Sequence, residues 1–248
     1  MTSLAAGKKQ EAKLAVEAKP HRWALSWPAR MYRRLNRGRN VTRHVEQYCQ
    51  PFEVEGPEHL ADFRGPALII ANHTSHFDSV IALSVLPEKL FDRTAIVAAA
   101  DRFYTNWRKG AWQSLRYNAF PITRGGGKAA LTYSQWLLRQ GWSLLVFPEG
   151  RRSRSGEQLP FHPGPAIMAL SGQVPVVPIH IQGAIDILPA GERQSRPAPV
   201  RVRIGAPIRF DEGTSVSDAT ALMEEAVRRL AGDQVAAAVE RELVTTSA

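Results

Sequence analysis

Cysteine is almost absent from this chain, and so are long apolar runs. The one cysteine, Cys49, excludes an intramolecular disulfide and a cysteine-rich zinc site, and it suits a reducing, cytosolic compartment. No apolar run approaches the roughly 20 residues that span a bilayer, and the basic N-terminal region is not followed by the apolar core of a secretory signal. We therefore expect no transmembrane helix, and any membrane contact is expected to be peripheral.

Positive charge is confined to the first part of the sequence. Residues 1–50 contain eleven Lys and Arg residues against three acids, a net charge of +8, whereas the remaining chain has 21 bases against 20 acids. Proteins that read nucleic acids usually spread basic and aromatic residues over the folded surface. Because the body of this chain is almost neutral, the charge pattern predicts no nucleic-acid partner.

Three parts of the chain differ in composition. Residues 1–20 mix Ala, Lys, Glu and Gln with few large apolar side chains, so we expect a disordered basic tail there. Residues 21–50 are rich in arginine and carry a large apolar residue at every fourth position: Trp23, Trp27, Met31 and Leu35. Residues 51–248 have a length and an apolar content that suit one folded domain.

The segment 21–50 predicts a basic amphipathic helix. Ser26 followed by Pro28 is a typical helix start, because proline is tolerated in the first turn. A helix with tryptophans on one side and arginines on the other is suited to lie on an anionic membrane, so we expect it to bind the cytoplasmic face of a membrane. The alternative is that the helix packs its apolar side on the domain and leaves its arginines in water.

Short apolar runs alternate with helical patterns from residue 66 onward. Six runs predict strands, at 67–71, 94–100, 119–123, 143–147, 174–181 and 200–205. Helical spacing predicts helices over 128–140, 162–172 and 216–242. Strands that alternate with helices favour an α/β fold, here a single domain with a central, largely parallel sheet flanked by helices.

Polar residues follow three of these predicted strands. NHTSHFD (72–78) comes after the first, RGGG (124–127) after the third and PEGRRSRSG (148–156) after the fourth. Ligands of open α/β sheets bind outside the carboxyl ends of the strands. The sequence therefore predicts a site at this edge that combines histidine, carboxylates and arginines.

His73 and Asp78 are candidates for a catalytic pair. They are five positions apart, which on one helix would place them roughly 140° apart. They therefore meet only if His73 ends the strand and Asp78 begins the next helix. A carboxylate bonded to one ring nitrogen leaves the other free to take a proton from a hydroxyl group. The alternative is that Asp78 caps the helix and His73 packs at the sheet edge.

A metal site is a second interpretation of the same residues. His73, His76 and Asp78 are residue types that zinc and iron bind, but such a site needs a third or fourth distant ligand. Only His162 and His180 lie in suitable places, and neither has another histidine or a carboxylate at ligand spacing. We therefore expect no bound metal.

Arginines follow the fourth predicted strand, and glycines follow the third. Glu149 precedes Arg151 and Arg152, and an acidic residue can orient guanidinium groups that bind a phosphate. The alternative is a solvated basic loop. The glycines at 125–127, after Arg124, would let backbone N–H groups approach an anion, although the sequence contains neither a GxGxxG nor a Walker motif.

These motifs, in this order, resemble the four blocks of the lysophosphatidate acyltransferase (1-acylglycerol-3-phosphate O-acyltransferase) family. NHTSHFD resembles the NHxSxxD block, FPITR (120–124) the second block, FPEGRRS (147–153) the FPEGTRS block and VPVVPI (174–179) the fourth. The resemblance covers residues 66–205. It implies transfer of an acyl group from acyl-CoA or acyl-carrier protein to a lipid-like alcohol, without a metal or another cofactor.

The resemblance also implies roles for individual residues. His73 would deprotonate the acceptor hydroxyl and Asp78 would hold His73, so that the acceptor oxygen attacks the thioester directly. The position of Cys49, outside every strand-end motif, agrees with a reaction that has no thiol nucleophile. The predicted substrate-binding residues are Asn72, Ser75, Arg124, Glu149, Gly150, Arg151, Arg152, Ser153 and Pro178.

Two departures from the family pattern concern the acceptor. Arg151 stands at the threonine of FPEGTRS, and Asn118-Ala119 stand where members often carry glycine and a further hydrophobic residue. The expected acceptor is 1-acylglycerol-3-phosphate and the expected product is phosphatidate; the alternative is another lipid or polyol acceptor. A metal-dependent hydrolase and a non-catalytic membrane-binding module are the other hypotheses.

Overall fold

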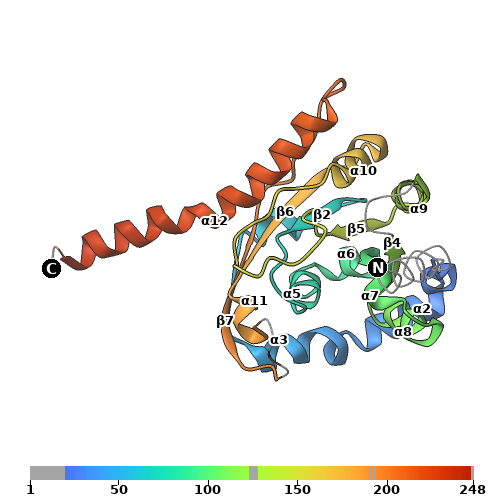
Figure 1. Ribbon diagram of the computed structural model, residues 1–248, viewed down its shortest axis with the longest axis horizontal. Helices are drawn as coiled ribbons and strands as arrows, with labels where there is room; N and C mark the ends of the chain where they lie inside the picture. Colours follow the sequence, from blue (N-terminus) through green and yellow to red (C-terminus); the bar gives the residue numbers. More distant parts are fainter. Residues whose placement is uncertain (1–19, 123–127, 190–191, 193, 247–248) are drawn as a thin grey trace, which may run out of the picture.

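Seven strands form one sheet in the order β1-β7-β6-β2-β5-β3-β4 (Figure 1). The computed structural model describes residues 20–122, 128–189, 192 and 194–246, so the predicted tail lies outside the described residues except for Pro20. Neighbouring strands are parallel, apart from the antiparallel pair β6–β7. The predicted α/β fold with a largely parallel sheet is therefore confirmed. The strands are β1 (Cys49–Glu55), β2 (Leu68–Ala71), β3 (Thr94–Ala99), β4 (Ala119–Ile122), β5 (Ser143–Val146), β6 (Val176–Gln182) and β7 (Ala198–Ile204).

All six predicted strands form, but the sequence did not predict β1. This strand lies at the sheet edge, where it pairs with β7, and most of its side chains are exposed. Glu53 forms an ion pair with Arg201, and Glu55 with Arg203, across the two strands. An edge strand of this kind needs no apolar run, because charged cross-strand pairs stabilise it.

Helices cover both faces of the sheet. The predicted helices over 128–140, 162–172 and 216–242 correspond to α9, α10 and α12, and α12 extends beyond the body (Figure 1). The helices are η1 (Arg22–Leu25), α2 (Trp27–Leu35), the π-helical η2 (Gly38–Thr42), α3 (Arg43–Tyr48), α4 (Glu58–Ala61), α5 (Asp78–Ser84), α6 (Glu88–Asp92), α7 (Ala100–Phe103), α8 (Trp107–Tyr117), α9 (Lys128–Arg139), α10 (Gly164–Gly172), α11 (Ala184–Ile187) and α12 (Val216–Thr246). None of the helices in the described ranges is both long and apolar enough to cross a bilayer.

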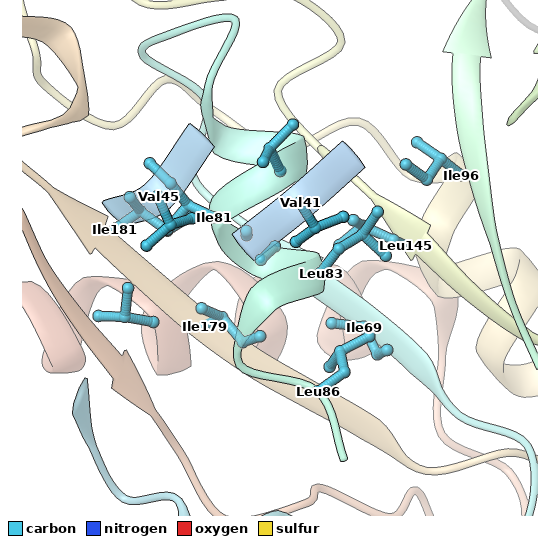
Figure 2. Close-up of a cluster of buried hydrophobic side chains, with 14 of the residues drawn as sticks. Val41, Val45, Ile69, Ile81, Leu83, Leu86, Ile96, Leu145, Ile179 and Ile181 are labelled. Carbon is cyan, nitrogen blue, oxygen red and sulfur yellow. The ribbon is translucent and has the colours of Figure 1, made fainter. Parts of the chain in front are cut away.

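The alternation of side chains along β2 divides the core into two layers. Ile69 packs into a cluster with α5, whereas Leu68 and Ile70 belong to the cluster on the opposite face. Val41 and Val45, from the segment 21–50, join the α5 cluster (Figure 2). This segment therefore contributes to the core of the domain.

In the segment 21–50, the tryptophans face the solvent and some of the arginines face the protein. Helix α2 begins after Ser26, as predicted, and ends at Leu35. Trp27 is 67% exposed and Leu35 is 76% exposed, whereas Arg33 is only 5% exposed. The alternative in which the apolar side packs on the domain is therefore wrong for these two residues.

Two inward-facing arginines, the buried Arg33 and the half-buried Arg37, attach the segment to the body. The Arg33 guanidinium donates to the backbone carbonyl oxygens of Ala24 at 2.7 Å and of Ser114, in α8, at 3.4 Å. Burial lowers the pKa of Arg33 to about 10. Arg37 donates to the carbonyl oxygens of Ser84 and Leu86. The inward arginines thus satisfy carbonyl groups at helix ends, whereas Trp27 and Leu35 stay exposed.

We expect an Arg33→Leu variant to lose about 1–3 kcal/mol of unfolding free energy in urea, because buried carbonyl groups lose their donor. Arg34→Leu is the matched control, since Arg34 and its partner Glu88 both have 57% exposed side chains. An exposed pair of this kind contributes less than about 1 kcal/mol. Equal losses in the two variants would contradict the assigned role of Arg33.

Candidate active site

Three adjacent strands end at the same edge of the sheet and carry the predicted site. β2 lies between β6 and β5, and β5 pairs in parallel with both β2 and β3. The loop 72–77 follows β2, the loop 147–163 follows β5, and α7 follows β3. Parallel register thus brings residues that are about 80 positions apart in the sequence into contact.

The structure places His73 and Asp78 in contact. His73 lies just after β2, and Asp78 is the first residue of α5. The Nδ1 atom of His73 lies 2.8 Å from Oδ2 of Asp78, and the same oxygen accepts the backbone N–H groups of Thr74 and Ser75 at 2.7 Å. The side chain of Asp78 is fully buried, whereas that of His73 is 20% exposed. This arrangement leaves Nε2 as the ring nitrogen that can accept a proton.

Phe147, the first residue after β5, supports the imidazole ring. The ring centroids of His73 and Phe147 are 4.2 Å apart, and the two planes are inclined by 23°. Stacking of this kind restricts the ring to one orientation. His73 is therefore held through Nδ1 and across one face of its ring.

Glu149 contacts backbone groups. One carboxylate oxygen accepts the His73 N–H group at 2.7 Å, and the other accepts the Leu159 N–H group at 3.1 Å. Burial raises the pKa of Glu149 to about 7, against the opposing effect of these two hydrogen bonds. Within the described residues Glu149 forms no ion pair with an arginine, so its predicted role in orienting guanidinium groups stays a prediction.

The side chain of Asn72 links β2 to β6. Its amide nitrogen donates to the Ile181 carbonyl at 2.9 Å, and its amide oxygen accepts the Ile181 N–H group at 2.7 Å. These bonds continue the β2–β6 pairing by one residue beyond the register that ends at Ala71 and Ile179. Both polar atoms of the amide are thus engaged inside the protein.

Other predicted substrate-binding residues also have local backbone roles. Ser75 is fully buried, and its hydroxyl accepts the Phe77 N–H group. Ser153 donates its N–H group to the His73 carbonyl oxygen at 2.7 Å. Pro178 lies inside β6, opposite Ile70, and its carbonyl oxygen accepts the N–H group of Gly205.

Gly150 allows the turn that follows β5. Its φ angle of +66° lies in the left-handed region, and a Cβ atom there would approach the His162 ring to 2.9 Å. A side chain at this position would therefore be strained on two grounds. The turn directs the arginines of the loop 147–163 to the same edge as His73.

Arginines from two strand ends approach the histidines. Arg102, in α7, contacts Nε2 of His76, and its positive charge lowers the pKa of Arg152, after the larger effect of burial. Arg154 acts on Arg152 in the same direction. Within the described part of the chain, none of these three arginines pairs with a carboxylate. Arg151 is exposed on the same loop, whereas Arg124 lies outside the described residues.

Arg102 and its contact with His76 were not predicted from the sequence. The signal was present, because Asp101-Arg102 directly follow the second predicted strand and therefore lie at the same edge as the other motifs. Burial, followed by the charges of Arg152 and Arg102, lowers the pKa of His76 to about 4. His76 is therefore neutral near pH 7 and can accept a hydrogen bond from Arg102.

The described residues offer neither a cluster of metal ligands nor a reactive thiol. The described residues contain no group of three or more His, Cys, Asp and Glu side chains arranged to hold a metal ion. Cys49 is buried at the start of β1, far in the sequence from the strand-end motifs, and burial raises its pKa to about 12. A thiol with so high a pKa is a poor nucleophile near pH 7.

Comparisons with known proteins agree with the motif order. The sequence model of the Acyltransferase family matches residues 51–182. A 1-acyl-sn-glycerol-3-phosphate acyltransferase from Limnanthes douglasii is 30% identical over 200 residues, which cover 77% of this chain and 66% of that protein. The alpha form from Homo sapiens is 29% identical over 203 residues, 76% of this chain and 69% of that protein. The chain spans 60–66% of the length of the plant relatives.

The fold is also found among solved structures. The crystal structure of the 1-acyl-sn-glycerophosphate acyltransferase PlsC from Thermotoga maritima matches with a TM-score of 0.65 and 24% sequence identity. The match covers 81% of this chain and 79% of that chain. This match therefore shows a shared fold.

An Asn72→Ala variant is expected to lose about 2–4 kcal/mol of unfolding free energy, because the buried N–H and C=O groups of Ile181 lose their partners. Asn36→Ala is the control, since the Asn36 amide makes a single local bond to Tyr32 at a helix end. The unfolding free energy of Asn36→Ala should fall by only about 1 kcal/mol. Urea unfolding of both variants tests this. A fully stable Asn72→Ala protein would argue for contact of Asn72 with substrate instead.

Proposed function

The chain belongs to the acyltransferase family, and from this premise we propose that it transfers a fatty acyl group to the hydroxyl of 1-acylglycerol-3-phosphate and so forms phosphatidate. The donor is the thioester of acyl-CoA or acyl-carrier protein. One observation carries the proposal: the His73–Asp78 pair lies beside arginines that have no carboxylate partner within the described residues. Such an arrangement suits an acceptor that carries both a hydroxyl and a phosphate.

His73 acts as the general base. Its Nε2 atom takes the proton of the acceptor hydroxyl as the oxygen attacks the thioester carbonyl carbon, and Asp78 stabilises the imidazolium that forms. The new C–O bond forms as the C–S bond breaks, and the imidazolium returns the proton to the departing thiolate. The reaction needs no acyl-enzyme, no metal and no other cofactor.

The arginines bind the acceptor phosphate. Arg102 and Arg152 come from different strand ends, so a phosphate between them would receive charge-assisted hydrogen bonds from two directions. Arg151 and Arg154 lie on the same loop as Arg152, and Arg124 is the predicted further contact. A dianionic phosphate also relieves the mutual repulsion of these guanidinium groups.

The protein works at the cytoplasmic face of a membrane, bound peripherally through the segment 21–50. Two packed helices, α2 and α8, carry exposed tryptophans: Trp27 is 67% exposed and Trp107 is 73% exposed. Residues 22–48 hold seven arginines against one acid, and α8 holds three basic residues and no acid. Tryptophan beside arginine is the composition that binds the interface of an anionic bilayer.

A His73→Ala variant is expected to lose 10²–10⁴-fold in kcat, the range for removal of a general base. The assay measures transfer of a labelled acyl group from acyl-CoA to lysophosphatidate, and it is repeated with acyl-carrier protein as donor. His59→Ala is the control, because His59 is exposed on α4. Full activity of His73→Ala would overturn the mechanism.

An Arg152→Gln variant should raise the KM for lysophosphatidate about 10- to 100-fold, the equivalent of a lost charged hydrogen bond. The KM for a monoacylglycerol, which has no phosphate, should change little. Arg64→Gln, at an exposed position before β2, controls for the loss of one positive charge. Equal changes for the two acceptors, or activity on non-phosphorylated alcohols alone, would contradict the phosphate site.

Flotation with phosphatidylcholine–phosphatidylglycerol vesicles tests the membrane contact. Replacement of Trp27 and Trp107 by alanine should weaken binding about tenfold or more, because two exposed apolar side chains no longer leave water. Leu222→Ala is the control, since Leu222 is 52% exposed on α12. Binding should also fall as salt rises. Unchanged flotation of the double variant would exclude this surface as the anchor.

A further inference from the structure

Glu149 ties together the two loops that form the site. It lies three residues beyond β5 and is only 2% exposed. Through His73 it holds the loop after β2, and through Leu159 it holds the far end of the loop 147–163. The arginines of that loop, Arg151, Arg152 and Arg154, lie between Glu149 and Leu159 in the sequence. Glu149 therefore bridges the base and the arginine loop.

The main chain of His73 is held on both sides by residues from the β5 loop. Its N–H group donates to Glu149, and its carbonyl oxygen accepts from the Ser153 N–H group, each at 2.7 Å. Residue 73 is not part of β2, whose ladder ends at Ala71, so sheet hydrogen bonds do not fix it. The position of the imidazole thus depends on contacts from the neighbouring loop.

Both contacts of Glu149 require the ionised carboxylate. Each oxygen accepts one N–H group, whereas a carboxylic acid would turn its O–H group toward one of these donors. Glutamine has the same limitation, because its NH₂ group cannot accept. The charge is costly in this place, since burial and the nearby carboxylates of Asp78 and Glu224 raise the pKa of Glu149 to about 7.

We propose that Glu149 is a positioning residue, which holds the main chain of His73 at the place from which its imidazole reaches the acceptor hydroxyl, and does not itself contact the acceptor. This role rests on the proposed general-base function of His73. It differs from a phosphate-site role, in which Glu149 would orient arginines and affect acceptor binding. The two roles predict opposite changes in steady-state kinetics.

A Glu149→Gln variant separates the two roles. We expect kcat to fall roughly 10- to 100-fold, the scale for a base displaced by about 1 Å, while the KM for lysophosphatidate stays within about twofold. Arg152→Gln is the matched control and should show the opposite pattern. A raised KM with unchanged kcat in Glu149→Gln would overturn the proposal.

A double variant tests whether Glu149 acts through His73. In a His73→Ala background, Glu149→Gln should cause no further loss of the residual rate, because the residue that it positions is gone. An equal further loss would show that Glu149 acts independently and would overturn the proposal. If wild-type activity does not depend on His73 at all, the proposed function fails first, so the two failures are distinguishable.

Hydrogen exchange provides a measurement that does not depend on activity, and its first part uses the wild-type protein alone. In the wild-type protein, the His73 and Leu159 amides should be protected, because they donate to a buried carboxylate. In Glu149→Gln, exchange at one or both should become faster while the β2 amides keep their protection. Rapid exchange at both amides in the folded wild-type protein would overturn the proposal.

Discussion

The buried carboxylate of Asp78 is the interaction on which the site depends. One of its oxygens accepts three N–H groups, from the imidazole of His73 and from the backbone of Thr74 and Ser75. These bonds close the loop between β2 and α5 into a turn, and they also fix which nitrogen of the imidazole carries the proton. A single charged oxygen therefore fixes both the turn after β2 and the tautomer of the His73 imidazole.

The ends of the two neighbouring strands, β5 and β3, contribute the other side chains of the site. The loop after β5 supplies Phe147, which stacks on the imidazole, and Glu149, which accepts the His73 N–H group, while β3 leads into α7 with Arg102. Each group alone could have a purely structural role: Phe147 as a core aromatic residue, Glu149 as an anchor of its loop and Arg102 as a surface cation. Their convergence depends on the parallel register of β2, β5 and β3, which is the property that makes this sheet edge a site.

The sequence predicted the sheet and the contact between His73 and Asp78 well, but it did not predict which backbone groups other polar side chains would bind. Apolar runs located β2 to β7 because buried strands must be apolar, but β1 is an edge strand stabilised by charged pairs and has no such signal. The spacing of His73 and Asp78 required a strand-to-helix turn, and the structure has one. By contrast, Asn72 and Glu149 carry side chains that bond to distant backbone groups, and periodicity holds no information about such partners.

In the segment 21–50, too, the start of the helix was predictable from the sequence, whereas the orientation of its side chains was not. Its helix start at Ser26 followed from local chemistry, whereas the outward direction of Trp27 and the burial of Arg33 depend on carbonyl groups at the end of α8. Arg33 and the strand β1 find their partners at Ser114 and in β7, about 80 and 150 residues further along the chain. During synthesis, these residues leave the ribosome long before those partners do. The segment 21–50 therefore completes these contacts only after most of the described chain has been synthesised, and until then the Arg33 guanidinium has no Ser114 carbonyl group to bind.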